Sequence, residues 1–171
     1  MKRLTLVRHA KSSWRDPDLA DHERPLSGRG KNDAPRMGER LRIRRVRPSL
    51  IATSTAKRAL QTAQIVADSL GYPREFLHIE PALYLADPAA ILAVVGAQDE
   101  GFSDLMLVGH NPGLTELVNG LLPDLRLNNL PTAGVVAMES TAVRWGDIGA
   151  RNTTLVFYDY PKSTDVVSSD S

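Results

Sequence analysis

Short apolar runs alternate with segments of helical periodicity along most of this chain. Runs of β-branched and aliphatic residues predict buried strands, whereas apolar residues that recur every three or four positions predict helices packed on a sheet. We expect strands at Leu4–Val7, Leu50–Ala52, Phe76–Ile79, Leu105–Val108, Val135–Met138 and Thr154–Tyr158. We expect helices at about 28–45, 56–70, 88–97 and 114–121.

The predicted helix boundaries rest on capping residues. Ser27 and Thr55 are the expected N-caps of the first two helices, and Gly71 is expected to end the second. Pro35 lies inside the first helix and predicts a kink or break, because proline cannot donate the helical hydrogen bond. The side chains expected to face inward from the first helix are Ala34, Met37, Leu41 and Ile43.

The order of elements predicts an α/β fold. A strand followed by a helix, repeated four times, indicates a three-layer α/β/α domain whose sheet is mostly parallel. The last two strands are expected to pair in an antiparallel manner at an edge. We expect one domain over residues 1–161, followed by a polar, serine-rich and frayed tail at 162–171.

Composition is ordinary for a soluble protein. The chain has 171 residues, of which 42% are hydrophobic and 24% charged, and its net charge of +1 favours neither nucleic acid nor an anionic membrane as a partner. The absence of cysteine excludes disulfides and cysteine-ligated zinc. The first apolar run has four residues, and no run approaches the roughly 18 that span a bilayer. A cytoplasmic location is therefore expected.

Polar residues follow three of the predicted strands. They are Arg8 with His9 after the first, Ser54 with Arg58 after the second, and His110 after the fourth. The carboxyl ends of parallel strands share one edge of a sheet, so these side chains should converge there. Arginine matches phosphate oxygens bidentately, and neutral histidine is nucleophilic near neutral pH. Each residue alone is commonplace, but the set together indicates a phosphate site.

Three motifs in this order resemble those of the histidine phosphatase superfamily, which includes the cofactor-dependent phosphoglycerate mutases. They are Leu6–Ala10, the segment from Ser54 to Thr62 that contains Arg58, and Val108–Pro112. Lys11–Trp14, together with Arg24–Leu26 and Arg29–Gly30, is similar to the SixA-type phosphohistidine phosphatases. The resemblance covers roughly residues 3–160 and implies a phosphoglycerate-mutase-like fold.

The resemblance also implies roles for single residues. His9 would attack phosphorus and carry the phosphoryl group, while Arg8, Arg58 and His110 would hold its oxygens. Water would then release phosphate, with no metal and no cofactor. Residues of a candidate substrate loop are Lys11, Ser12, Trp14 and Arg24.

Three functions are compatible with these motifs. The resemblance to the SixA type implies a phosphorylated substrate, namely a protein domain that bears phosphohistidine. The alternatives are a broad phosphomonoesterase of small molecules on the same site, and a non-catalytic module that binds phosphate or phosphoproteins. The intact set of His9, Arg8, Arg58 and His110 argues against the last, since binding alone needs no nucleophile.

One departure from the family concerns the general acid. Many relatives place a glutamate after the third strand or an aspartate after the second histidine, where this chain has Leu83–Ala86 and Asn111. Glu80 and Asp87 are near but match neither position. A general acid contributes about 10²- to 10⁴-fold to the rate, so unactivated alkyl phosphates should be poor substrates. A labile P–N bond would suffer less, and an acid from the Asp16–His22 loop remains an alternative.

Positive charge gathers between Arg24 and Arg47, where nine basic residues accompany two acidic ones. A solvated helix face explains such a stretch. It could also dock an acidic phosphoprotein or steer phosphate esters toward the site.

Overall fold

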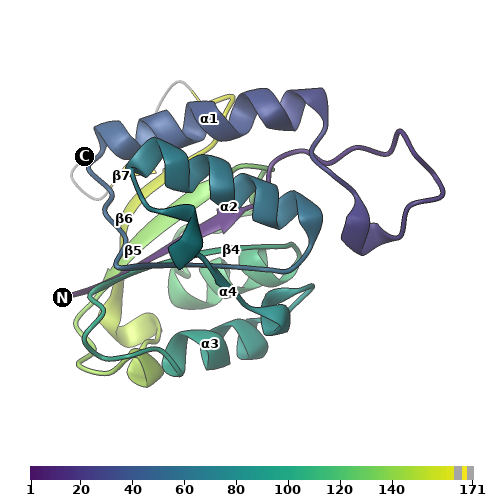
Figure 1. Ribbon diagram of the computed structural model, residues 1–171. Coiled ribbons are helices and arrows are strands. Elements are labelled where there is room, and N and C mark those ends of the chain that lie inside the picture. Colours follow the sequence, from purple (N-terminus) through teal and green to yellow (C-terminus); the bar gives the residue numbers. More distant parts are fainter. Residues whose placement is uncertain (164–166, 169–171) are drawn as a thin grey trace.

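A seven-stranded sheet forms the middle layer in the computed structural model, which describes residues 1–163 and 167–168 (Figure 1). The strands run in the order β3-β2-β4-β1-β5-β6-β7 across the sheet. The first four of these are parallel, and β5, β6 and β7 pair antiparallel at the other edge. Their bounds are β1 Lys2–Arg8, β2 Leu50–Thr53, β3 His78–Ile79, β4 Asp104–Gly109, β5 Val135–Ser140, β6 Thr153–Asp159 and β7 Val167–Ser168.

Helices cover both faces of the sheet, as Figure 1 shows. One layer holds α1 (Gly28–Ile43) and α2 (Lys57–Leu70), and the other holds α3 (Pro88–Gly96) and α4 (Gly113–Leu121). Alternate side chains of a strand point to opposite faces, so Leu6 of β1 packs in one core and Val7 in the other. The predicted three-layer α/β/α fold with an antiparallel edge is confirmed. Short 3₁₀ helices lie at Asp21–Glu23, Arg74–Phe76, Pro81–Leu83, Trp145–Asp147 and Ala150–Asn152.

The first helix differs from expectation at two points. Ser27 is its N-cap, as predicted, and the Ser27 side chain accepts a hydrogen bond from the Gly30 backbone N–H at 3.1 Å. Of the kink or break predicted at Pro35, the break is wrong, because α1 continues through Pro35 with Ala34 and Met37 buried on either side. Ile43 does not face inward; it is 66% exposed, since it is the last residue of the helix.

The second helix, α2, begins at Lys57, one residue later than predicted. Ala56 occupies the N-cap position of α2 without a side-chain hydrogen bond, so the prediction of Thr55 as the cap is wrong. The Thr55 hydroxyl instead bonds the ring of His22 at 2.7 Å. Gly71 does end α2, in the left-handed conformation with φ 70°.

Two further segments were predicted with different extents. The strand expected at Phe76–Ile79 is only the two residues of β3, because 74–76 form a 3₁₀ turn. Within the tail expected to fray from residue 162 onward, residues 167–168 form β7 beside β6. The rest of that expectation, at 164–166 and 169–171, lies outside the described residues.

The topology brings three strand ends together. β4 lies between β2 and β1, with Arg8 opposite Gly109 and Thr53 opposite Val108. The residues that directly follow these strands therefore share one edge of the sheet. Within the described residues, no helix is both long and apolar enough to traverse a lipid bilayer.

Candidate active site

The structure brings the four predicted site residues together. His9 follows β1 and His110 follows β4, and the two ring centroids lie 5.2 Å apart. Arg58, in the first turn of α2, places its Nη2 3.5 Å from His110 Nδ1. Arg8 closes β1 on the same edge. The site is thus built on rigid elements rather than on loop tips.

The His9 ring is held in one tautomer. Its Nδ1 lies 2.7 Å from the carbonyl oxygen of Ala10, and a carbonyl can only accept, so Nδ1 carries the proton. Nε2 consequently keeps its lone pair. Burial, and then the positive charges of Arg58 and Arg8, lower the pKa of His9 to about 4 despite the Ala10 contact. The ring is therefore neutral at neutral pH.

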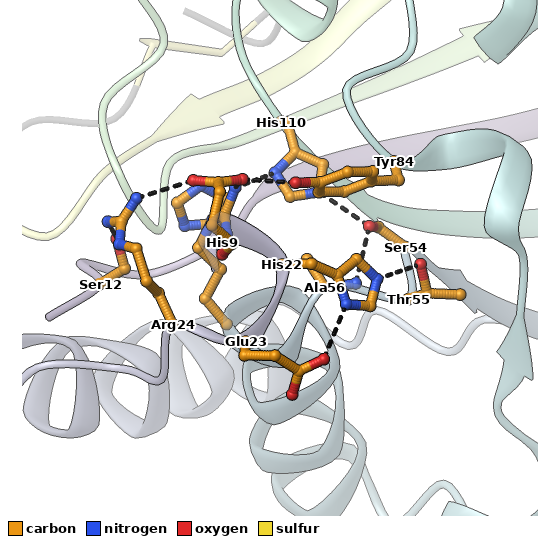
Figure 2. Close-up of polar contacts among 12 residues, drawn as sticks. His9, Ser12, His22, Glu23, Arg24, Ser54, Thr55, Ala56, Tyr84 and His110 are labelled. Carbon is orange, nitrogen blue, oxygen red and sulfur yellow. Dashed lines mark hydrogen bonds and ion pairs between the residues drawn. The ribbon is translucent and has the colours of Figure 1, made fainter. Parts of the chain in front are cut away.

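His110 is also neutral and is oriented by its neighbours. Its Nε2 lies 2.7 Å from the Ser54 hydroxyl, which explains the polar residue at the end of β2 (Figure 2). Arg58 can only donate, so Nδ1 of His110 faces it as an acceptor and Nε2 carries the proton. Burial is the main cause that lowers the pKa of His110 to about 3, followed by the charges of His9 and Arg58.

The two arginines have different partners. Arg58 is buried and donates through Nη1 to the Asp21 carbonyl oxygen at 2.7 Å and through Nη2 to the Asp21 carboxylate at 3.0 Å. Arg8 donates through Nη1 to the Leu130 carbonyl oxygen at 2.9 Å. Its buried Nε has no hydrogen-bond partner within the described part of the chain. A buried N–H without an acceptor is costly, so an anion at this position would stabilise it.

Asp21 is a site residue that the sequence did not single out. Its carboxylate accepts hydrogen bonds from the Tyr84 hydroxyl at 2.5 Å, from Arg58 and from Arg24 Nη1 at 3.0 Å. The Tyr84 hydrogen bond is the largest cause that lowers the pKa of Asp21 to about 2; burial opposes it, and Arg58 and then Arg24 add to the lowering. Nothing in the spacing of the sequence could pair Asp21 with Tyr84, because they are 63 residues apart.

His22, which none of the three sequence motifs contains, also lies at the site. Figure 2 shows its ring between Thr55 and Glu23, with nitrogen–oxygen distances of 2.7 and 3.2 Å. Its ring also meets that of Tyr84 edge to face, with centroids 4.8 Å apart. The remaining histidine, His78, is exposed and pairs with Glu80.

Two residues of the candidate substrate loop, Ser12 and Trp14, contact a third, Arg24. The Arg24 guanidinium donates to the Ser12 hydroxyl, and Figure 2 shows these two side chains beside each other. The same guanidinium stacks 3.4 Å above the ring centroid of Trp14, which is 71% exposed. Lys11 is exposed, and its carbonyl oxygen accepts from the Ser27 backbone N–H at 2.8 Å. The start of the loop is therefore fixed to the beginning of α1.

The second motif also fixes the segment after His9. The Thr62 hydroxyl accepts from the Ala10 backbone N–H at 3.0 Å and donates to the Arg58 carbonyl oxygen at 2.8 Å. Gln61 accepts from the Leu26 backbone N–H at 2.8 Å. These two side chains of α2 hold both ends of the loop.

The other acidic candidates have structural contacts. Glu80 and Asp87 accept hydrogen bonds from the backbone N–H groups of Ala82 and Ala90 at helix starts. Asn111 accepts from the backbone N–H of Thr115 in α4. Asp16 accepts from the Asp18 backbone N–H. Over residues 1–163 and 167–168, no cluster of three or more His, Asp or Glu side chains could hold a metal ion.

Much of the basic stretch is engaged in ion pairs. Arg40 bonds Asp159, whose side chain is 2% exposed, at 3.0 Å, and also donates to the carbonyl oxygens of Tyr160 and Pro161. Further pairs are Arg24–Asp21, Arg29–Asp33, Arg36–Asp33 and Arg42–Glu39. These contacts favour a structural role for part of the stretch, and its docking role stays a prediction.

Comparison with known proteins places these residues in context. Residues 4–83 match the sequence profile of the histidine phosphatase superfamily, branch 1. A crystal structure described as a candidate phosphohistidine phosphatase SixA from Agrobacterium tumefaciens is 30% identical, with a TM-score of 0.78 over 94% of this chain and 98% of that one. A structure of the protein histidine phosphatase SixA with tungstate is 22% identical and shares the fold, with a TM-score of 0.77 over 93% of this chain and 97% of that one.

A curated plant relative is also similar in sequence. An uncharacterized chloroplastic protein of Arabidopsis thaliana is 33% identical in an alignment of 133 positions that covers 70% of this chain. The match covers 59% of that relative, so this chain spans less than two thirds of its length.

Proposed function

Because this chain belongs to the histidine phosphatase superfamily, we propose that it hydrolyses phosphorylated substrates through a covalent phosphohistidine intermediate on His9. The chain is a phosphatase with the phosphoglycerate-mutase-like fold of that superfamily. The observation that carries the mechanism is the state of His9. Its ring is neutral and carries its proton on Nδ1, so the lone pair of Nε2 is free to attack. Two arginines and His110 lie beside the ring.

In the proposed first step, Arg8 and Arg58 hold the phosphoryl oxygens while Nε2 of His9 attacks phosphorus. His110 joins them once the bound anion raises its pKa and the ring takes a proton at Nδ1, the nitrogen that faces Arg58. The bond to the leaving group breaks as the P–N bond forms. The ring gains positive charge, which the Ala10 carbonyl oxygen stabilises through Nδ1–H. Fixed donors aimed at the developing charge are typically worth 10²- to 10³-fold each, and the Nε of Arg8 is a buried donor of this kind.

In the second step, water attacks the phosphorus of phosphohistidine. The P–N bond breaks, its electron pair returns to Nε2, and inorganic phosphate leaves. A low pKa for His9 favours this release, because a less basic nitrogen is a better leaving group.

The substrate we propose is a phosphohistidine side chain of another protein, as in the SixA type. The support is the likeness to the Agrobacterium protein described as a candidate phosphohistidine phosphatase. Exposure around the site also supports it, since Trp14 beside Arg24 is 71% exposed and Leu85, next to Tyr84, is 56% exposed. Large apolar side chains held in solvent suit contact with a macromolecule better than with a small ester.

The test is to trap the intermediate. Acid-free quenching with a ³²P-labelled substrate should leave base-stable, acid-labile label on the wild-type chain. His9→Ala should lose both label and turnover while it keeps the wild-type melting temperature, and His78→Ala, an exposed histidine, should behave as wild type. More than a few per cent of activity in His9→Ala would show the assignment to be wrong. A faster reaction on small esters than on a phosphohistidine protein would favour the small-molecule alternative.

A further inference from the structure

The Asp21 carboxylate lies among the groups that the proposed reaction uses. It contacts Arg58, Arg24 and the Tyr84 hydroxyl, with oxygen distances of 3.0, 3.0 and 2.5 Å. Its side chain is 45% exposed, so a leaving group or a water molecule can reach it from solvent. In the part of the chain that the structure describes, no other acidic side chain pairs with Arg58.

We propose that Asp21 is the general acid and base of this site and that Tyr84 is its positioning residue. The proposal rests on the phosphohistidine mechanism above and adds the proton transfer that this mechanism leaves open. It replaces the glutamate or aspartate of many relatives by a carboxylate that arrives from the loop between β1 and α1. Tyr84, in the segment after β3 where many relatives have a glutamate, directs its hydroxyl to that carboxylate.

Substrate binding changes the charges that surround Asp21. As the structure stands, the Tyr84 hydrogen bond contributes most to holding the pKa of Asp21 at about 2, and Arg58 adds both a hydrogen bond and a charge. Phosphoryl oxygens need the same guanidinium, so they compete with the carboxylate for it. When they win, Asp21 loses a cation and gains an anion, and both changes raise its pKa. Arg24, Tyr84 and His110 are the other titratable groups that face Asp21.

The protons balance over the two steps. A phosphate monoester has a second pKa near 6, so its monoanion can give a proton to Asp21 as it binds. When Nε2 of His9 bonds to phosphorus, the electron pair of the broken bond stays on the leaving atom, which takes the proton from Asp21. This atom is the oxygen of an ester or a ring nitrogen of a substrate phosphohistidine. In the second step, water bonds to phosphorus and gives a proton to the Asp21 carboxylate. The electron pair of the P–N bond returns to His9, and Asp21 releases the proton with phosphate.

Neighbouring rings fix Tyr84 for this role. Its ring meets His110 edge to face at a centroid distance of 5.4 Å and His22 at 4.8 Å. Figure 2 shows Tyr84 and His110 beside each other, with His22 bonded to Thr55. The hydroxyl of a ring held on two sides can keep a loop carboxylate at one position.

The test uses Asp21→Asn, which keeps the size and hydrogen-bond acceptor of the side chain but cannot carry the proton. Asp18→Asn, an exposed residue of the same loop, is the matched control. We expect Asp21→Asn to lose 10²- to 10⁴-fold in kcat/KM on alkyl phosphates and less than about tenfold on the most activated aryl phosphates. Hydrolysis of the label on His9 should also slow. The wild type and Asp18→Asn should depend only weakly on leaving-group pKa.

Two outcomes would overturn the proposal. One is an equal loss of rate for all leaving groups in Asp21→Asn. The other is tighter binding of inorganic phosphate with no leaving-group selectivity, which would mean that Asp21 only competes for Arg58. If Asp21→Asn does not fold, Tyr84→Phe serves instead and should show the same selectivity, reduced to about tenfold. In Tyr84→Phe the pKa of Asp21, measured by NMR, should rise from about 2 toward 3.8. The rate loss in the same variant should be larger for alkyl than for aryl phosphates. A tyrosine with a purely structural role would not produce that leaving-group selectivity.

The two proposals fail in different ways. If no label forms on His9 of the wild type, the phosphohistidine mechanism fails. If the label forms and Asp21→Asn shows no leaving-group selectivity, only the role of Asp21 fails.

Discussion

Gly30 tests how tightly the nucleophile depends on the start of α1. It lies in the first turn of that helix, where an added Cβ would overlap the carbonyl oxygen of Lys11. That oxygen already accepts hydrogen bonds from the Ser27 backbone and hydroxyl, at 2.8 and 3.1 Å. Restoring a van der Waals distance near 3.5 Å requires the two backbones to separate by about 1.4 Å.

Only two peptide units separate the displaced Lys11 carbonyl group from His9. Ala10, which precedes Lys11, holds the proton on Nδ1 of His9 through its carbonyl oxygen. A shift of about 1 Å in catalytic geometry can cost about 10²-fold in rate, so Gly30→Ala should lose about that factor in kcat. Overpacking of this kind typically costs about 1–3 kcal/mol, or a fall of roughly 2–12 °C in melting temperature for a chain of this size.

Gly28→Ala is the matched control. It adds the same methyl group in the same helical turn, but nothing lies within 4 Å of the new Cβ. Alanine is favoured over glycine in helices by up to about 1 kcal/mol, so Gly28→Ala should melt at or slightly above the wild-type temperature with unchanged kcat. The assay is turnover of an aryl phosphate alongside thermal unfolding. Gly30→Ala with a kcat within twofold of wild type would refute the coupling between α1 and His9.

Three further predictions concern charge. Imidazole NMR should find His9 and His110 neutral at pH 5.5, because burial and neighbouring cations lower their pKa values to about 4 and 3. The unfolded chain then binds protons that the folded chain does not, so the free energy of unfolding should fall as the pH falls from about 6.5 to 4; a denaturant midpoint that stays level over this range would contradict the shifts. Arg58→Lys should lose about 10²-fold or more in kcat/KM on an aryl phosphate. Lysine keeps the charge but loses the two-pronged guanidinium that bonds Asp21 in the structure and phosphoryl oxygens in the proposed mechanism. Kinetics within twofold of wild type would place Arg58 outside the phosphate contacts. Arg40→Ala should unfold about 2 kcal/mol more easily with unchanged kcat, since it leaves the buried Asp159 unpaired, whereas Arg42→Ala, from an exposed pair, should change stability by less than about 1 kcal/mol.

The contacts of Arg40 also change how the basic stretch should be tested for docking. Charge reversal at Arg40 would disturb the fold, so Arg45→Glu with Arg47→Glu, both exposed, is the cleaner variant. A solvated face predicts that kcat/KM for a phosphoprotein and for an aryl phosphate respond equally. A selective loss on the phosphoprotein, steeper at low salt, would indicate docking instead.

Local sequence signals determined the fold and the edge of the sheet where the site lies. Buried runs such as Leu105–Val108 are long enough to predict strands, and strand order then places His9 and His110 together. The same signals failed where tertiary contacts override local preference. Thr55 has the chemistry of an N-cap, but the ring of His22 bonds its hydroxyl instead.

Asp21 was beyond the reach of the sequence for a different reason. Its role depends on Tyr84 and Arg58, and these lie 63 and 37 residues further along the chain. A loop side chain carries no periodicity, so only the folded chain shows which carboxylate meets the arginine. The sequence did raise an acid from the Asp16–His22 loop as an alternative, and the contacts now distinguish Asp21 from its neighbours there.

The loop between β1 and α1 leaves the body of the protein and returns to the place where it started (Figure 1). Its two arms are joined where Ser13 donates to the Pro25 carbonyl oxygen at 2.8 Å and where Ser12 pairs with Leu26. Because the ends are already closed, a change in length between residues 14 and 24 would alter closure entropy only slowly and would not strain the sheet. Over evolutionary time, such a loop can be lengthened or recomposed to admit new partners while the histidines stay fixed. Under the role proposed for Asp21, that freedom has one constraint: every replacement must still deliver a carboxylate to Arg58.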